Sequence, residues 1–230
     1  MRRATDMAVL YQESYIVSPA SAHPSPRIFV MFLYPRLLVL FALVALPAYA
    51  APEKYVIDPD HTYPSFEMPH MGISVWRGKF TRSSGEVTLD LAARSGSVNI
   101  EIASGSIDFG HAGMDTHAVT DDWLNASKYP TMTYAGTLRF NGDTPSGVDG
   151  SLTLRGVTKP VKLTINTFKC IDHPYYNKPV CGADASGEFD RADFGMTQYA
   201  DNGMGRIRLQ IQVEAFKDKL PAPPEATKKD

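Results

Sequence analysis

The chain has 230 residues, of which 43% are hydrophobic and 21% charged, and its formal net charge is −2. This size and composition fit one globular domain with accessory segments. The near-neutral balance, without a cluster of Lys and Arg interleaved with aromatic residues, argues against a nucleic-acid partner.

The first 50 residues contain the pattern of a secretory signal peptide. Arg36 is followed by ten apolar residues, by Pro47 and then by Ala48-Tyr49-Ala50, an Ala-x-Ala cleavage site. A membrane anchor is the alternative, but the apolar run is shorter than the about 20 residues that span a bilayer. We therefore predict cleavage after Ala50 and export to the periplasm. Translation from Met31 would give a leader of ordinary length, so residues 1–30 are either a long n-region or not translated.

The chain has two cysteines, Cys170 and Cys181, and the predicted export would expose them to an oxidising environment. In an oxidising compartment only one intramolecular pairing is open to them, so we expect a disulfide that closes the loop between them. A Cys–His metal site is the alternative, but the third and fourth ligands are missing nearby.

From residue 51 the chain reads as short strands separated by turn signals. Apolar residues take every second position, which gives each strand one apolar and one wet face. Pro64 marks an edge or a bulge in the first strand. The expected strands cover residues 62–68, 75–81, 85–90, 98–102, 131–140, 148–155, 161–166, 183–190 and 206–215.

The clearest pair is a hairpin within residues 147–168, where Val148, Leu152 and Leu154 alternate with polar residues. Its turn is expected between Arg155 and Pro160, because Gly156 allows unusual backbone angles and Pro160 fixes φ.

One segment, residues 119–126, predicts a helix. Thr120 would cap it, Asp121 and Asp122 would suit its first turn, and Pro130 would follow its end. The expected strands, which are antiparallel, fit either a two-sheet sandwich or a closed barrel. Residues 218–230, with three prolines and several charges, predict a disordered tail.

Motifs of catalysis are missing from the sequence. There is no Gly-x-Ser-x-Gly elbow, no His-Glu-x-x-His pair and no Gly-rich phosphate loop, so no enzyme, metal or cofactor is predicted. Asp115 and His117 would share a face on a strand, where a carboxylate could orient an imidazole. A structural hydrogen bond is the simpler interpretation of that pair. The Asp193-Phe194-Gly195 triplet of kinases stands without the other kinase motifs.

Five segments, in order, resemble the YceI family. They are Tyr-Val-Ile-Asp-Pro-Asp-His-Thr (residues 55–62), His-Met-Gly…Gly-Lys-Phe (70–80), Asp-Thr-His (115–117), Leu-Thr-Leu-Arg-Gly-Val-Thr-Lys-Pro-Val (152–161) and Arg-Ala-Asp-Phe-Gly-Met (191–196). The resemblance implies an all-β fold over residues 51–217, an antiparallel eight-stranded lipocalin-like β-barrel with one short helix. It also implies a long isoprenoid-type lipid, polyprenyl or quinone-like, inside the barrel, and leaves room for a homodimer and for transient membrane contact.

The resemblance also suggests roles for individual residues. The motif residues His61, His70, Asp115, His117, Arg191, Asp193 and Gly195 are expected to be structural, with Arg191 and Asp193 pairing or bonding the backbone and Gly195 in a turn. An apolar strand face usually packs in a solid core, but in a family that carries lipids the same face is expected to line a lumen. The expected lumen residues are Phe66, Trp76, Phe80, Ile100, Ile102, Tyr134, Leu138, Leu152, Leu154, Val161, Leu163, Ile165, Leu209, Ile211 and Val213.

Two other functions remain open from the sequence. One is an enzyme that modifies a lipid with Asp115 and His117. The other is a module with a solid core that binds protein partners.

Overall fold

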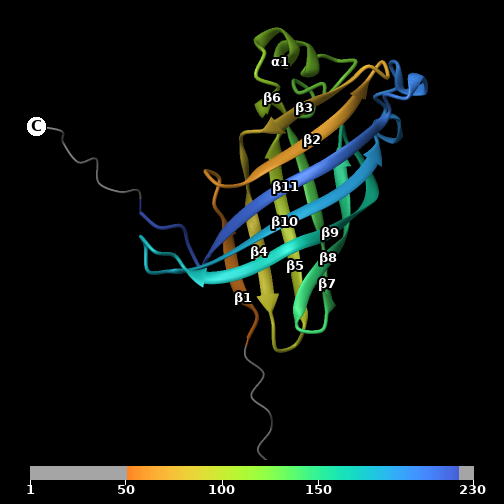
Figure 1. Ribbon diagram of the computed structural model, residues 1–230. Coiled ribbons are helices and arrows are strands. Elements are labelled where there is room, and N and C mark those ends of the chain that lie inside the picture. Colours follow the sequence, from red (N-terminus) through yellow and green to blue (C-terminus); the bar gives the residue numbers. More distant parts are fainter. Residues whose placement is uncertain (1–50, 223–230) are drawn as a thin grey trace, which may run out of the picture. The chain divides into compact units, whose positions relative to one another are not determined.

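A computed structural model describes residues 51–222 of the chain (Figure 1). Within that range there are eleven strands, one α-helix and three short 3₁₀ helices. The strands are β1 (Glu53–Ile57), β2 (Tyr63–His70), β3 (Ser74–Phe80), β4 (Ser83–Asp90), β5 (Ser95–Ala103), β6 (Ile107–Asp108), β7 (Thr131–Asn141), β8 (Thr144–Leu154), β9 (Val157–Asp172), β10 (Pro179–Asp190) and β11 (Arg206–Lys217). The helices are α1 (Ala112–Ala118), η1 (Ser104–Ser106), η2 (Arg191–Phe194) and η3 (Ala200–Asn202).

Eight of these strands form a closed ring, in the order β1-β4-β5-β7-β8-β9-β10-β11 and back to β1. Every neighbouring pair in the ring is antiparallel. The predicted eight-stranded antiparallel barrel is thereby confirmed, and the sandwich is excluded. Closure leaves the ring without free edges, which an open sheet of this size would expose to other chains.

Strand β11 has two different partners on one side. Residues 215–217 pair with β1, whereas residues 208–212 pair with β2. The chain between β1 and β2, residues 58–62, bends at this change of partner. As a result β1 closes the barrel at one end, and the β2–β3 hairpin extends the wall at the end where α1 lies (Figure 1).

Pro64 lies in β2 opposite Ile211, and the pairing of β2 with β3 begins only at Ser65. At Pro64 the strand therefore has a neighbour on one side, as predicted for a residue without an N–H group.

The central hairpin turns more tightly than the sequence predicts. Leu154 pairs directly with Val157, so the loop consists of Arg155 and Gly156 alone, with φ angles of 53° and 75°. Two residues with positive φ match the twist of antiparallel strands. Pro160 is not in the turn but inside β9, opposite Ser151.

The helix also differs in position from the prediction. It covers residues 112–118 and begins at His111, whose Nδ1 accepts a hydrogen bond from the Met114 N–H. Residues 119–126 form successive turns instead. Thr120 caps no helix start, because its hydroxyl donates to the His117 carbonyl oxygen. Thr and Asp residues suit a run of turns as well as they suit the start of a helix.

Two predictions concern residues outside the described range. The signal peptide falls on residues 1–50, and most of the predicted disordered tail falls on residues 223–230. In the described part of the chain, no helix has the length and apolar character needed to cross a membrane.

Candidate functional site

The barrel encloses a cavity of about 520 Å³. Its wall consists almost wholly of apolar side chains that every ring strand contributes. All fifteen residues expected in the lumen line it: Phe66, Trp76, Phe80, Ile100, Ile102, Tyr134, Leu138, Leu152, Leu154, Val161, Leu163, Ile165, Leu209, Ile211 and Val213. Their placement follows from the two-residue period of a strand. That they contact a ligand stays a prediction.

The strand pattern did not reveal every lining residue. Phe109, Met114, Ala118, Trp123 and Leu124 also line the cavity. They belong to α1 and to the irregular segments on either side of it, which carry no period-two pattern. In the sequence, only the density of large apolar residues in this otherwise polar stretch could have identified them.

These residues cover one end of the lumen, and Trp123 holds the cover in place. Its indole Nε1–H donates to His117 Nε2 at 2.9 Å, and its backbone carbonyl accepts a hydrogen bond from Arg155. The guanidinium carbon of Arg191 lies 4.7 Å from the centre of its ring. The cover is thus tied to α1, to the β8–β9 turn and to η2.

Arg191 is the most deeply buried charged residue of the described chain, with 1% of its surface exposed. Its guanidinium donates to three backbone carbonyls, those of Met204 at 3.0 Å, Met196 at 2.5 Å and Gln198 at 2.5 Å. Burial lowers the pKa of Arg191. Because the carbonyls and the indole face surround the charge, it stabilises the loop of residues 192–204.

The Arg-Ala-Asp-Phe-Gly motif covers η2 and the turn that ends it. Arg191 bonds the backbone, and among the described residues it forms no ion pair with Asp193, whose side chain is exposed. Gly195 ends η2 with a φ of 81°, a left-handed conformation that suits glycine. The role of Gly195 in a turn therefore matches its geometry.

The structure separates Asp115 from His117. Both lie on α1, where residues two apart point in different directions, so the shared strand face on which the pairing depended does not exist. Asp115 Oδ1 accepts the Phe109 N–H at 2.8 Å, while His117 accepts from Trp123. Each side chain supports the cover by a hydrogen bond of its own.

Tyr134 brings a hydroxyl group into the wall of the lumen. The hydroxyl donates to the Val161 carbonyl at 2.8 Å, and desolvation raises the pKa of Tyr134 above its usual value. A satisfied phenol of this kind stays neutral and adds little polarity to the cavity.

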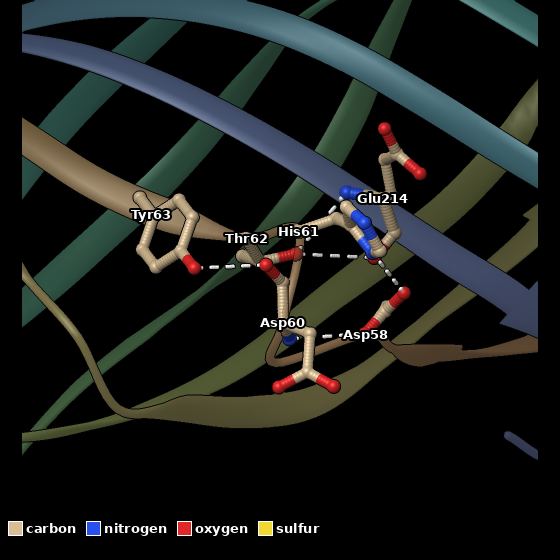
Figure 2. A network of polar contacts seen from close by, with 6 residues as sticks. All are labelled: Asp58, Asp60, His61, Thr62, Tyr63 and Glu214. Atoms are coloured by element: carbon tan, nitrogen blue, oxygen red, sulfur yellow. Dashed lines mark hydrogen bonds and ion pairs between the residues drawn. The ribbon is translucent and has the colours of Figure 1, made fainter. Parts of the chain in front are cut away.

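A polar network occupies the bend between β1 and β2 (Figure 2). His61 Nδ1 lies 2.7 Å from Asp58 Oδ2, and this hydrogen bond is the main cause that raises the pKa of His61. Thr62 Oγ1 donates to the Glu214 carbonyl at 3.2 Å and accepts the Glu214 N–H at 3.1 Å. The network fastens the bend to β11.

Asp58, His61 and Glu214 also place one potential ligand atom each within 4.8 Å of one another. In the described part of the chain they are the group of side chains that could hold a metal ion, whereas the sequence predicts no metal site. Their Asp-x-x-His spacing was the available signal. The direct contact between His61 and Asp58 already accounts for two of the three groups.

His70 and the two cysteines take structural positions. The His70 ring stacks on Trp76 with centroids 4.0 Å apart. Cys170 in β9 and Cys181 in β10 are directly paired in the ladder and form the predicted disulfide. The bond closes the loop of residues 173–178.

Comparison with known proteins finds relatives that match most of this chain. The YceI-like domain matches residues 55–215. The UPF0312 protein of Shewanella denitrificans is 32% identical over 185 residues, which cover 78% of this chain and 95% of that protein. Protein YceI of Salmonella arizonae is 32% identical over 184 residues, with 78% and 95% covered.

Solved structures share the fold. BcnA of Burkholderia cenocepacia has a TM-score of 0.57 and 22% identity, covering 69% of this chain and 99% of BcnA. The YCEI protein of Campylobacter jejuni has a TM-score of 0.56 and 24% identity, covering 66% and 91%. A polyisoprenoid binding domain from Saccharophagus degradans has a TM-score of 0.51 and 13% identity, covering 71% and 98%. With its barrel, its lumen and a family match over most of its length, this chain belongs to the YceI-like family.

Proposed function

We propose that this protein is a periplasmic carrier that holds one long isoprenoid-type lipid in its barrel lumen and catalyses no reaction on it. The observation that carries the proposal is the apolar cavity of about 520 Å³. Its volume lies within the roughly 300–1,000 Å³ of known ligand sites. A solid core would leave no such space, since packed interiors contain few voids larger than a water molecule.

The chemistry of the wall supports a hydrocarbon ligand. Exposing an isoprenoid chain to water costs about 0.8 kcal/mol of free energy for each CH₂ group, so a carrier has to enclose the chain. In this barrel the polar lining groups, such as the Tyr134 hydroxyl and the Arg191 guanidinium, already bond protein carbonyls. The binding described for the Saccharophagus degradans domain, which has the same fold, supports a polyisoprenoid in particular.

Binding without chemistry is favoured by the contacts of Asp115 and His117. Each is engaged in a separate hydrogen bond in the cover, and neither positions the other for proton transfer. A periplasmic location is supported by the predicted signal peptide and by the disulfide, which suits an oxidising compartment.

A pair of tryptophan substitutions on adjacent residues tests the proposal. Leu209 lines the cavity, whereas Gln210, the next residue of β11, lies on the outer surface. In Leu209→Trp the indole should fill space that the lipid would take. The lipid recovered per protein should fall, while the melting temperature of the lipid-free protein should change little.

Gln210→Trp is the control and should leave the lipid content unchanged, because its side chain points away from the lumen. In a solid core Leu209→Trp would instead cost roughly 1–3 kcal/mol through overpacking. A large loss of stability with unchanged lipid content would refute the carrier. Native mass spectrometry of protein taken from its own periplasm identifies the lipid itself.

A further inference from the structure

The β2–β3 hairpin extends past the rest of the barrel wall. Its pairing with β11 ends at Glu67, opposite Arg208, but its two strands remain paired with each other up to His70 and Ser74. The pairing of β3 with β6 involves only Lys79 and Phe80. Residues 68–76, which we call the hairpin tip, therefore pair only within the hairpin in the described part of the chain. In Figure 1 the tip lies at the same end of the barrel as α1.

The tip is mostly apolar and carries no formal charge, and its outer residues, 71–75, are exposed to solvent. Residues 68–76 read Met-Pro-His-Met-Gly-Ile-Ser-Val-Trp, without Asp, Glu, Lys or Arg. The exposed fractions are 66% for Met71, 80% for Ile73 and 36% for Val75. The nearest charged residues, Glu67 and Arg77, form an ion pair at 2.8 Å at the base of the tip. An exposed apolar group of this kind marks a surface that contacts another apolar phase.

The turn of the tip carries an apolar residue where backbone geometry favours a polar one. Met71 and Gly72 have φ angles of 55° and 73°, and the Ile73 N–H donates to the His70 carbonyl at 3.1 Å. A β-turn whose two central residues both have positive φ angles favours Asn-Gly or Asp-Gly at those positions. Met71 therefore occupies the turn of the hairpin although the backbone conformation there favours a polar residue.

The apolar surface of the tip continues into the lumen. Met68 and Trp76, paired at the base of the tip, both line the cavity. Phe109, which leads into α1, lies against Trp76 with ring centroids 6.3 Å apart. A hydrocarbon chain that enters along the tip would therefore meet no charged side chain within residues 68–76 before it reaches Met68 and Trp76 at the lumen.

We infer that the hairpin tip inserts into the surface of a lipid bilayer and is the point at which the barrel takes up or releases its lipid. The inference rests on the proposed carrier function, because it assumes that the lumen ligand comes from a membrane. A bilayer fits the tip better than an anionic partner does, since residues 68–76 offer no cation. Trp76, on which the His70 ring stacks with centroids 4.0 Å apart, is a side chain of the kind that is enriched at the membrane–water boundary.

The test uses the full mature protein and vesicles of phosphatidylcholine, which carry no net charge. The variant Met71→Asn with Ile73→Thr removes the two most exposed apolar side chains of the tip. It should preserve the hairpin, because Asn-Gly suits the turn and threonine is compatible with the residue that leads into β3. The matched control, Leu91→Thr with Ile171→Thr, removes two apolar residues exposed at 44% and 47% on other elements.

Wild type and control should bind the vesicles alike, and the tip variant should bind at least about tenfold more weakly, as expected when two apolar side chains stop being buried. A polarity-sensitive fluorophore on Ser74→Cys should brighten when vesicles are added. The same fluorophore on Ser95→Cys, at the start of β5, should not.

Equal vesicle binding by wild type and tip variant, or no binding by wild type, overturns the inference. So does a wild-type dimer that becomes monomeric in the tip variant without any vesicle binding, because the tip would then serve a second copy of the chain. The lipid content of the protein after loading from detergent tests the carrier function independently of vesicle binding. Lipid held without vesicle binding rejects only the docking, and vesicle binding through the tip with an empty lumen rejects only the carrier.

Discussion

Arg191 shows how a single buried residue can organise one end of the barrel. Its three hydrogen bonds all go to carbonyls in residues 196–204, a segment with little regular structure of its own. The sequence motif indicated a structural role, but the identity of the acceptors depends on how the loop folds back. No periodic pattern encodes such a path, so the partners of Arg191 could not be predicted.

Replacing Arg191 with lysine should destabilise the protein by roughly 2–4 kcal/mol, because one ammonium group cannot reach three separated carbonyls in the geometry of a guanidinium. The measurement is the midpoint of urea unfolding. Arg94→Lys is the control, since Arg94 is an exposed partner of Asp143 and its loss should cost at most about 0.5 kcal/mol. Equal effects of the two changes would contradict the structural role of Arg191.

His61 should make the stability of the barrel depend on pH. Its pKa is raised in the folded state, mainly by the hydrogen bond to Asp58, so folding favours the protonated imidazole. The stabilisation is fully present below the unfolded pKa of about 6.5 and is lost as the pH rises through the higher folded value. The side chain is 59% exposed, so the gain is at most about 1 kcal/mol.

The free energy lost in His61→Gln should therefore be larger at acidic than at alkaline pH, as measured by chemical unfolding at both. In an Asp58→Asn background the same substitution should lose this pH dependence. A pH-dependent loss that persists without the Asp58 carboxylate would show that another group is responsible.

At the scale of elements, the sequence predicts best where side chains alternate and worst where the chain is irregular. Strand β11 and the β8–β9 hairpin were identified because each has one apolar face. Strand β1, which closes the ring, is only five residues long and was not singled out. The sequence predicts a helix after α1 because Thr120, Asp121 and Asp122 resemble a helix start, whereas in the structure His111 caps the helix.

The disulfide between β9 and β10 should contribute measurably to stability. In the chain-entropy model a loop of this size corresponds to about 3 kcal/mol, a model-dependent value. The double variant Cys170→Ala with Cys181→Ala should unfold at lower urea concentration by that amount, and reduced wild type should behave like it. Denatured but unreduced wild type should show no reactive thiol, and labelling of both thiols would refute the bond in the isolated protein.

At the scale of the whole molecule, the sequence established the lining but not the cavity. A period of two gives the same inward face to a solid core and to a tunnel, and only the volumes of side chains across the ring decide between them. The fifteen lumen positions could therefore be predicted, whereas the cover formed by Phe109, Trp123 and Leu124 could not, because it comes from a segment without periodicity.

The proposed periplasmic location makes a simple prediction about the mature chain. N-terminal sequencing of the exported protein should begin at Ala51, because Ala48-Tyr49-Ala50 forms the expected cleavage site. Replacing Ala48 with a large charged residue should cause the uncleaved form to accumulate. An exported protein that retains Met1 or Met31 would contradict the prediction.

The pairing of β1 with β11 also bears on how the chain folds. Tyr55 lies opposite Lys217, so the contact that seals the barrel joins the first and last strands of the domain. Contacts between positions so distant in sequence form slowly, because a long loop must close before they contribute. During synthesis the seal waits for β11, and until then β1 and β10 present unpaired edges to other chains.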